Sequence, residues 1–296
     1  MQKKPKFTVL VSAYNAEKYI KDAVTSILTQ DYEGIIHTIV LLDLGTTDKT
    51  DDILRSFILK RIKNRPITII RHPHTFLFRA LLIGMNKSDG EITLFLDYDN
   101  KFKKEHISDL YKLSIETKFK FAFSNAELID KNGKKLHSNL ISNFPKHNSF
   151  SSLVIGNYID LNTIAIRKDL QRKLIKILFE LDDRFYDYLH TDYLIALISS
   201  KLTTLIELKK IGVLYRSHRS NVTYGNKNKL FTTGLELRSL LACYTHSFYN
   251  LLNAREKLFL NARIYLLGRR ITDLAKYKRI SLLTKGMGFL LRNIFL

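Results

Sequence analysis

Cysteine is almost absent from this chain of 296 residues, in which Cys243 is the single example. One thiol excludes an internal disulfide and any metal site built from several cysteines. Disulfides persist in oxidising compartments, so the composition favours a reducing, cytoplasmic setting. Proline and glycine are also scarce, with 4 and 12 residues. Such small numbers leave no room for long flexible linkers between domains.

Long apolar runs are missing as well. No stretch reaches the roughly 18 to 20 apolar residues that a helix needs to cross a bilayer. The N-terminal sequence MQKKPKFTVLVSAYNAEKYI has a basic start, but its apolar run is only about seven residues long. We therefore interpret this run as a first strand rather than as a signal peptide.

Acidic residues are few compared with basic ones. The chain has 28 Asp and Glu residues and 48 Lys and Arg residues, which gives a formal net charge of +20. This charge predicts anionic partners, among which nucleic acid, nucleotide-linked substrates and acidic lipid headgroups all qualify. With 45% hydrophobic and 26% charged residues, the composition is that of a globular protein. The length allows one large α/β domain, or one domain with an extension.

Strands and helices are expected to alternate along the first part of the chain. Apolar runs predict strands at residues 6–14, 35–42, 67–71 and 92–96. Helical spacing of apolar residues predicts helices after Asn15, which can cap a helix, and over residues 48–61 and 76–88. Helices between successive strands imply a mostly parallel sheet with right-handed crossovers, and hence an α/β fold.

Polar residues follow three of the expected strands, at the edge where parallel sheets bind ligands. They are Ser12, Tyr14 and Asn15 after the first strand, Asp43, Gly45 and Asp48 after the second, and Asp97 and Asp99 after the fourth. Because the carboxyl ends of parallel strands lie along one edge, we expect these groups to converge on a single site.

The segment GEITLFLDYDN ends an apolar run in two carboxylates, Asp97 and Asp99. One explanation is structural, since Asp and Asn are common in turns that follow strands. The other is chemical, since two carboxylates two residues apart can hold a divalent cation against the phosphates of a ligand. The segment alone does not choose between the two.

The pattern changes in the second half of the chain. Asn132-Gly133 between two short strand-like runs predicts a hairpin. A strand is expected at residues 162–167, followed by a basic helix that ends near Phe179. A further helix over residues 190–200 carries Asp192 in its first turn, and from about Asn226 onward we expect only helix.

Several phrases of the sequence resemble the family 2 glycosyltransferases, which have the GT-A fold. In the N-terminal half they are VLVSAYNAEKYI, SILTQDY, LDLGTTDKT and GEITLFLDYDN. In the second half they are GNYIDLNTIAIRKDL, LDDRFYDYLHTDYLIAL and YRSHRSNVT. The match covers roughly residues 6–224, and the order and spacing of the phrases carry it.

The resemblance implies a GT-A, Rossmann-like domain over residues 1–225, with a nucleotide-sugar half at about 1–100 and an acceptor half at about 101–225. Residues 226–296 would form a basic, amphipathic, helical extension. The implied activity is a metal-dependent, inverting transfer of a sugar from a nucleotide-sugar to a surface glycan or lipid-linked glycan, such as lipopolysaccharide or capsule.

The resemblance also implies roles for single residues. Asp99 would be the first ligand of Mn²⁺ or Mg²⁺, with Asp97 acting through a water or a ribose hydroxyl and His218 as a further ligand. Asp192 would be the general base, with Asp187 as its nearest rival; the structural alternative is a carboxylate placed to favour the helix dipole. The nucleotide-sugar would be lined by Ser12, Tyr14, Asn15, Asp43, Gly45, Asp97 and Arg216.

Two positions depart from the family pattern. Leu44 stands where the loop after the second strand has a second Asp, and Thr191 stands where a Glu precedes the catalytic Asp. These departures leave a second hypothesis open, a GT-A-like protein that binds nucleotide or glycan at the membrane without turnover. His72 and His74 flank a proline and are assigned no role.

The C-terminal tail is rich in basic and apolar residues. From Arg255 onward about ten Lys or Arg and two acids alternate with Leu, Ile, Phe and Tyr. Basic amphipathic helices of this kind lie on anionic membrane surfaces. Packing of the apolar face on the catalytic domain is an alternative, and interleaved aromatic and basic residues also suit RNA. We favour peripheral attachment to the cytoplasmic face of the inner or plasma membrane, with no nucleic-acid partner.

Overall fold

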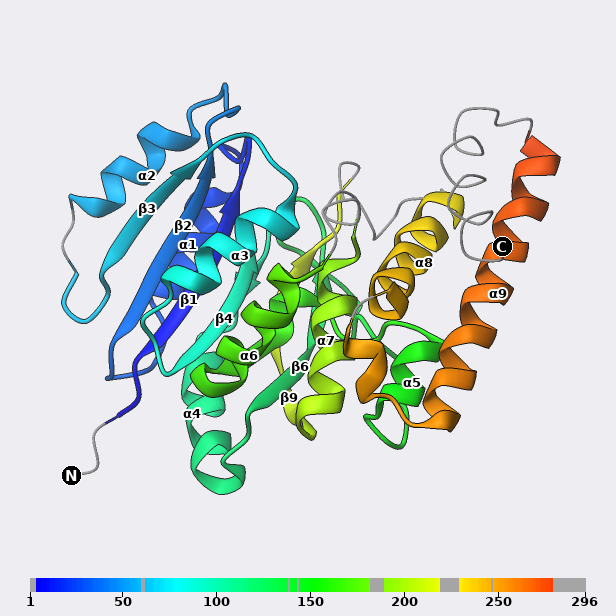
Figure 1. The fold of residues 1–296 in the computed structure, drawn as a ribbon. Coiled ribbons are helices and arrows are strands. Elements are labelled where there is room, and N and C mark those ends of the chain that lie inside the picture. The colour runs from blue at the N-terminus through cyan, green and yellow to red at the C-terminus, as the bar shows by residue number, and fades with distance from the viewer. Residues whose placement is uncertain are drawn as a thin grey trace.

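A nine-stranded mixed sheet forms the centre of the structure (Figure 1). The structure is a computed structural model, and it describes residues 4–59, 62–137, 139–142, 144–181, 189–218, 229–245 and 247–278. The strand order is β3-β2-β1-β4-β8-β6-β9-β5, with β7 paired to β6. The parallel part consists of β1 (Phe7–Ala13), β2 (Ile36–Asp43), β3 (Ile67–His72) and β4 (Ile92–Asp97). Because β2 and β4 lie on opposite sides of β1, the strand order reverses at β1. Ligands bind beyond the carboxyl ends of the strands at such a reversal.

The rest of the sheet is mostly antiparallel. It consists of β5 (Lys101–Phe102), β6 (Phe121–Ile129), β7 (Lys135–His137), β8 (Ile164–Arg167) and β9 (Leu205–Arg216). β8 runs antiparallel to both β4 and β6, so it joins the two parts of the sheet. The hairpin predicted at Asn132-Gly133 is confirmed, since β6 and β7 pair antiparallel around it and Gly133 has a φ of 88°.

Helices cover both faces of the sheet. They are α1 (Ile20–Leu28), α2 (Thr50–Ile58), α3 (Leu77–Lys87), α4 (His106–Thr117), α5 (Phe150–Ile155), α6 (Lys168–Phe179), α7 (Thr191–Leu202), α8 (Lys229–Thr245) and α9 (Ala254–Lys278). One apolar core contains side chains of α1, α2 and α4, and the other contains those of α3 and α5 to α9. In β1, Leu10 packs in one core while Val9 and Val11 pack in the other, which explains why this strand is apolar throughout.

The expected strands and helices of the first part of the chain are all present, but Asn15 does not cap the helix that follows it. The first helix begins at Ile20, with Tyr19 as its N-cap residue and no capping side-chain hydrogen bond. Asn15 has a φ of 45°, in the left-handed region that Asn tolerates better than most residues. Its Oδ1 accepts a hydrogen bond from Thr47 N at 2.9 Å, so Asn15 holds the loop after β2 instead.

The C-terminal helices pack at the end of the molecule away from β3 (Figure 1). The buried side chains of Leu260, Ile264 and Leu267 attach α9 to the core. Two ion pairs add to this contact, from Lys201 to Glu256 at 2.7 Å and from Arg263 to Glu236 at 2.6 Å. The prediction of an all-helical tail holds for the described part, apart from a 3-10 turn at Ser247–Leu251. The division of the chain into domains at residues 225 and 226 stays a prediction.

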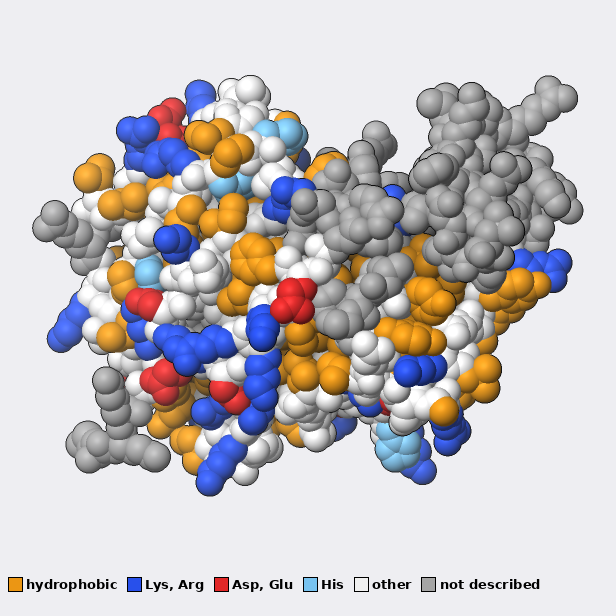
Figure 2. Space-filling model, in the orientation of Figure 1, with side chains coloured by type: hydrophobic (Ala, Val, Ile, Leu, Met, Phe, Trp, Pro, Cys, Tyr) orange, Lys and Arg blue, Asp and Glu red, His pale blue; other side chains and the backbone are white. Residues whose placement is uncertain are grey.

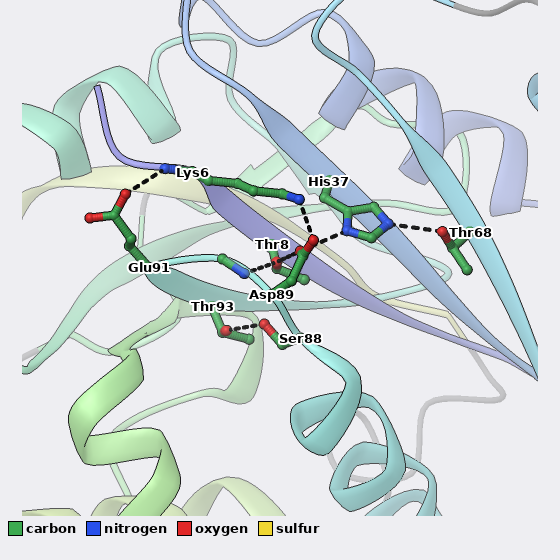
Figure 3. A network of polar contacts seen from close by, with 9 residues as sticks. Lys6, Thr8, His37, Thr68, Ser88, Asp89, Glu91 and Thr93 are labelled. Carbon is green, nitrogen blue, oxygen red and sulfur yellow. Dashed lines mark hydrogen bonds and ion pairs between the residues drawn. The ribbon is translucent and has the colours of Figure 1, made fainter. Parts of the chain in front are cut away.

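A polar network joins the starting ends of the parallel strands, opposite the ligand-binding edge (Figure 3). Asp89 accepts a hydrogen bond from Lys6 and another from His37 Nδ1 at 2.9 Å. The other ring nitrogen, His37 Nε2, lies 2.9 Å from Thr68 Oγ1. Burial alone raises the pKa of Asp89, but the contacts with His37 and Lys6 outweigh it and lower the pKa to about 2. The network therefore stabilises the pairing of β1, β2 and β3 electrostatically.

Candidate active site

Two neighbouring strands bring the first pair of predicted site residues together. Ser12 and Asp97 are register partners at the ends of β1 and β4. Ser12 Oγ donates a hydrogen bond to Asp97 Oδ1 at 3.0 Å. The expected convergence at this edge of the sheet is therefore present for these two residues.

Asn162 holds Asp97 from the other side. Asp97 N donates to Asn162 Oδ1 at 2.6 Å, and Asn162 Nδ2 donates to Asp97 Oδ2 at 3.1 Å. The same amide nitrogen also donates to Asp160 Oδ1 at 2.8 Å. Asp160 caps the 3-10 turn at Leu161–Thr163, which leads into β8 next to β4. Both carboxylates are thus fixed through a single amide.

Asp99 contacts the predicted histidine. His218 Nε2 lies 2.8 Å from Asp99 Oδ2, and the two side chains are only 10% and 12% exposed. The His218 ring stacks on Tyr19 with its centroid 5.4 Å away. Asp99 and His218 come from the loops after β4 and β9, so distant parts of the chain complete this pair.

Arg216 lies behind this pair. Its Nε donates to Asp99 O at 2.9 Å, and its terminal nitrogens donate to Lys131 O at 3.0 Å and Asp22 Oδ2 at 3.1 Å. The residue is 2% exposed, and its guanidinium lies 4.6 Å from the centroid of Tyr19. Because these nitrogens are bound to the protein, Arg216 fixes the backbone of Asp99 rather than pointing toward a ligand.

Asp192 is the second residue of α7 and lies near the other carboxylates. Its Oδ1 is 3.2 Å from His190 Nδ1 and accepts a hydrogen bond from Tyr193 N at 2.7 Å. His190 N in turn donates to Ser239 Oγ of α8 at 3.0 Å. Thr191, at the position where the family pattern has Glu, is buried. Asp187, the rival base, lies outside the described residues.

The carboxylates of this site repel one another. Burial raises the pKa of Asp97 to about 6, with further contributions from the charges of Asp99 and Asp192. Burial also raises the pKa of Asp160 to about 7, and the charge of Asp192 adds to the rise. The pKa of Asp99 is raised by burial as well, although the contact with His218 opposes this. Four acidic groups therefore share one poorly solvated region with an excess of negative charge.

A cation would relieve this repulsion. Among the described residues no cluster of three or more His, Cys, Asp or Glu side chains is arranged to hold a metal ion. The groups that are present still fit a hard divalent cation, because Asp97 and Asp99 offer carboxylate oxygens and His218 already contacts Asp99. Magnesium sites of this kind are commonly completed by waters and by phosphates of the substrate.

A second group of side chains lies at the ends of β1, β2 and β3. Asp43 accepts hydrogen bonds from Gly45 N at 2.7 Å and Thr75 N at 3.3 Å, and His74 Nδ1 lies 3.0 Å from its Oδ1. Tyr14 packs on the His74 ring with a centroid distance of 5.1 Å. The predicted residues Tyr14, Asp43 and Gly45 therefore come together, around a histidine that was assigned no role.

Four residues of the site, Asp160, Asn162, His190 and His74, were not predicted from the sequence. Asp160 and Asn162 belong to the phrase GNYIDLNTIAIRKDL, and His190 directly precedes the helix of Asp192. Asp160 and Asn162 are two positions apart and lie just before an apolar strand. Asp and Asn in this position are typical of turns, and this pattern marks Asp160 as a capping residue. Nothing local marks Asn162 as a partner of Asp97, because the two residues are 65 positions apart.

The sequence matches the family model of Glycosyl transferase family 2 over residues 8–173. An uncharacterized glycosyltransferase of Haemophilus influenzae is 26% identical over 263 residues, which cover 88% of this chain and 93% of that protein. Glycosyltransferase GlyA of Streptococcus pneumoniae is 32% identical over 120 residues, or 40% of this chain, and the match spans only 16% of GlyA. The putative teichuronic acid biosynthesis glycosyltransferase TuaG of Bacillus subtilis is 28% identical over 45% of this chain and 51% of its own length.

Solved structures share the fold. TarS of Staphylococcus aureus in complex with UDP-GlcNAc superimposes with a TM-score of 0.67 at 16% identity, over 95% of this chain and 77% of that one. The mannosyltransferase PcManGT of Pyrobaculum calidifontis, in complex with GDP-Man and Mn²⁺, gives a TM-score of 0.59 at 14% identity, over 98% and 81% of the two chains. At these identities the likeness establishes the fold, and the expected α/β fold of GT-A type with a helical C-terminal part is confirmed.

Proposed function

The chain belongs to glycosyl transferase family 2, and from that premise we propose that it moves one sugar from a nucleotide-diphosphate sugar to a hydroxyl group of a surface glycan or glycolipid. The observation that carries the proposal is the convergence of Asp97, Asp99 and Asp192. The charges of Asp99 and Asp192 both raise the pKa of Asp97, so the three carboxylates share one region at the ligand-binding edge of the sheet.

The donor class is supported by the ligands of the solved structures. TarS was crystallised with UDP-GlcNAc, and the Pyrobaculum mannosyltransferase with GDP-Man and Mn²⁺. In this chain the nucleoside would lie along the ends of β1 and β2, against residues predicted for it from the sequence: Ser12, Tyr14, Asn15, Asp43, Gly45 and Asp97. Arg216 would act indirectly, by holding the backbone of the loop that carries Asp99.

Asp99 and His218, with Asp97 beside them, would hold Mn²⁺ or Mg²⁺. When bound, the cation supplies Lewis-acid neutralisation of the leaving diphosphate. Ser12 and Asn162 keep the Asp97 carboxylate in place through hydrogen bonds of 3.0 and 3.1 Å. These contacts orient the acidic side chain toward the edge of the sheet where the donor would bind.

Asp192 would act as the general base of the transfer. It takes the proton of the acceptor hydroxyl as the acceptor oxygen forms a bond to the anomeric carbon of the donor sugar. The bond from that carbon to the diphosphate oxygen breaks at the same time, and the electron pair leaves with the nucleoside diphosphate. This single displacement inverts the anomeric centre. His190, 3.2 Å from Asp192 Oδ1, orients the carboxylate for this role.

The acceptor is proposed from the relatives. One is a putative teichuronic acid biosynthesis glycosyltransferase, and another, from Staphylococcus aureus, is a poly(ribitol-phosphate) beta-N-acetylglucosaminyltransferase. These names favour a glycan of the bacterial surface, such as lipopolysaccharide, capsule or a related glycoconjugate. They support the class of acceptor and leave the choice of linkage to experiment.

We also propose that α9 lies against an anionic membrane surface. On this helix the side chains of Leu258, Phe259, Tyr265 and Leu266 are exposed, and so are the basic residues Arg255 and Arg270. Apolar and basic side chains lie side by side along this end of the molecule (Figure 2). Exposed apolar side chains next to basic ones favour binding to acidic headgroups. None of the described helices is long and apolar enough to span a bilayer. Co-sedimentation with vesicles containing phosphatidylglycerol tests the proposal, and Leu258→Glu with Leu266→Glu should abolish the binding.

Turnover is tested by measuring the release of nucleoside diphosphate from UDP-sugars and GDP-sugars, with Mn²⁺ and a panel of surface-glycan fragments. We expect release that depends on the acceptor and is lost in Asp192→Asn. Glu116→Gln is a matched control, because Glu116 is an exposed carboxylate on α4. Binding of a nucleotide-sugar without any turnover would favour the alternative, a GT-A-like binding protein. Failure to bind any nucleotide-sugar would contradict both.

A further inference from the structure

The Asp43 carboxylate at the end of β2 is already hydrogen-bonded by other groups of the protein. Asp43 Oδ1 accepts a hydrogen bond from Gly45 N at 2.7 Å, and Asp43 Oδ2 accepts one from Thr75 N at 3.3 Å. His74 Nδ1 lies 3.0 and 3.1 Å from the two oxygens. The Asp43 side chain is only 5% exposed. A ligand that approaches this edge of the sheet therefore meets His74 before it meets Asp43.

The contact with Asp43 fixes the proton on the His74 ring. Burial alone raises the pKa of Asp43, but its hydrogen bonds from Gly45, His74 and Thr75 lower the pKa below its usual value. The carboxylate is thus ionised at neutral pH and acts only as an acceptor, so Nδ1 carries the ring proton. In the neutral ring Nε2 is then a hydrogen-bond acceptor. It has no hydrogen-bond partner among the described residues, and the side chain is 66% exposed.

Glycine at position 45 leaves room for this arrangement. A Cβ atom at Gly45 would lie 3.0 Å from Asp43 Oδ1 and 3.0 Å from His74 Nδ1. Contacts this tight would require the imidazole or the carboxylate to shift by a few tenths of an ångström. The small residue predicted for close approach to a ligand therefore also allows close approach of His74 to Asp43.

An aromatic surface lies beside the free ring nitrogen. The Tyr14 ring is 45% exposed and lies 5.1 Å from the His74 ring, at an interplanar angle of 46°. Leu44, 60% exposed, is next to Asp43 in the loop after β2. Flat bases stack on such side chains whatever their hydrogen-bonding edge, so a stacked base gains affinity without sequence preference.

We propose that His74 Nε2 accepts a hydrogen bond from the imino N–H of the donor's nucleobase, which stacks on Tyr14. This inference rests on the proposed function, because it supposes a nucleotide-sugar donor. Uracil and thymine carry an imino N–H at N3, and guanine carries one at N1, whereas cytosine and adenine have an unprotonated nitrogen at the corresponding position. A lone pair facing the lone pair of Nε2 is repelled, so the site selects diphosphate sugars of uridine, thymidine or guanosine over those of cytidine and adenosine.

The test is isothermal titration calorimetry with UDP, GDP, CDP and ADP in the presence of Mn²⁺. It includes the preferred nucleotide methylated at its imino nitrogen. The key variant is His74→Asn, whose side-chain amide can replace Nδ1 as donor to Asp43 but has no counterpart of Nε2. His74→Phe keeps a ring and removes both nitrogens, and Tyr14→Ala removes the stacking surface. His147→Ala is the control, since His147 is exposed and its side chain has no hydrogen bond among the described residues.

Wild type should bind UDP or GDP about tenfold more tightly than CDP, ADP and the methylated analogue, as expected for one hydrogen bond. Both His74 variants should lose this selectivity, and Tyr14→Ala should weaken all nucleotides about equally. If wild type binds nucleotides and both His74 variants keep its selectivity, the inference is overturned and the proposed function stands. A preference for CDP or ADP also overturns the inference. If wild type binds no nucleotide, both the proposed function and this inference fail.

Discussion

His218 Nε2 lies 2.8 Å from Asp99 Oδ2, although 119 positions separate the two residues in the chain. The pairing of strands across the sheet makes this possible, because Arg216 at the end of β9 donates from its backbone N–H to Asn100 Oδ1 at 2.8 Å. The loops after β4 and β9 are thereby held together at the edge where the ligand is proposed to bind. Two of the predicted metal ligands, Asp99 and His218, are thus in direct contact.

The first prediction concerns the proposed base. Asp192→Asn should lower kcat about 10³-fold, since general base catalysis contributes roughly 10²–10⁴-fold. Donor affinity should change less than threefold, because the amide has nearly the same shape as the carboxylate. His190→Ala should lower kcat by a smaller factor, about tenfold, since His190 only orients Asp192. Steady-state kinetics and donor titrations measure both effects, and equal losses in kcat and donor affinity would assign Asp192 to binding instead.

The second prediction concerns Asn162, which acts through Asp97. Asn162→Ala removes the side-chain hydrogen bonds to Asp97 N at 2.6 Å and to Asp97 Oδ2 at 3.1 Å. It also removes the hydrogen bond to Asp160 Oδ1 at 2.8 Å. We expect the apparent affinity for Mn²⁺ to fall about tenfold or more, as is typical when partners of metal ligands are removed. Asn162→Asp should not restore the affinity, because a carboxylate cannot donate to Asp97 and Asp160. Unchanged Mn²⁺ dependence in Asn162→Ala would contradict a positioning role.

A third prediction follows from a buried histidine outside the site. His106 packs against Gly212 of β9 and Phe102 of β5, and in the described part of the chain neither ring nitrogen has a hydrogen-bond partner. Burial lowers the pKa of His106 from 6.5 to about 4. The unfolded chain therefore binds a proton near pH 6.5 that the folded chain does not bind until about pH 4. Stability is highest above pH 6.5 and is lost as the pH falls toward 4, by about 3 kcal/mol in total.

Urea unfolding of wild type and His106→Leu between pH 7.5 and 4.5 measures this effect. The free energy of unfolding of wild type should fall relative to that of His106→Leu as the pH decreases. Above pH 7 the difference between the two proteins should be constant. The same substitution at the exposed His147 provides the control. A difference that does not depend on pH would show that the folded protein protonates His106 normally.

The fourth prediction concerns the network around Asp89 (Figure 3). Its lowered pKa means that the ionised form stabilises the fold, so this contribution is complete above about pH 4 and is lost as the pH falls toward 2. Asp89→Asn should destabilise the protein at pH 7 by about 1 kcal/mol, a small value because the side chain is 51% exposed and its ion pairs are screened. Thermal unfolding should show a decrease in Tm of roughly 2–4 °C. Glu116→Gln, with the same change in charge on α4, should leave Tm unchanged.

The fold of the parallel half could be predicted from the sequence, because each element there is marked by its own residues. The apolar run before Asp97 is a strand, and Asp97 and Asp99 follow it at the edge where ligands bind. In contrast, β9 was not predicted. Its residues include Glu207, Lys209 and Lys210, and it pairs with β6 through register shifts that no local pattern reveals.

The site was only partly predictable for the same reason. Asp97 and Asp99 are recognised by their position, but the role of Asn162 depends on β8 pairing antiparallel with β4. The contact of His74 with Asp43 likewise depends on the parallel pairing of β2 and β3. From the sequence, Arg216 was expected to contact the ligand. Its guanidinium instead donates buried hydrogen bonds to Asp99 O, Lys131 O and Asp22, which the sequence does not reveal.

The most direct test of the account is the Mn²⁺ dependence of nucleotide binding by wild type and Asp99→Ala, measured by thermal shift with UDP-sugars and GDP-sugars. A ligand that binds only the native state raises its stability by RT ln(1 + [L]/Kd), so about 100-fold saturation adds about 2.7 kcal/mol. We expect a rise in Tm with one nucleotide class that requires Mn²⁺ and is absent in Asp99→Ala. A rise of equal size in Asp99→Ala, or none with any nucleotide-sugar in wild type, would contradict a metal-dependent nucleotide-sugar site at Asp99.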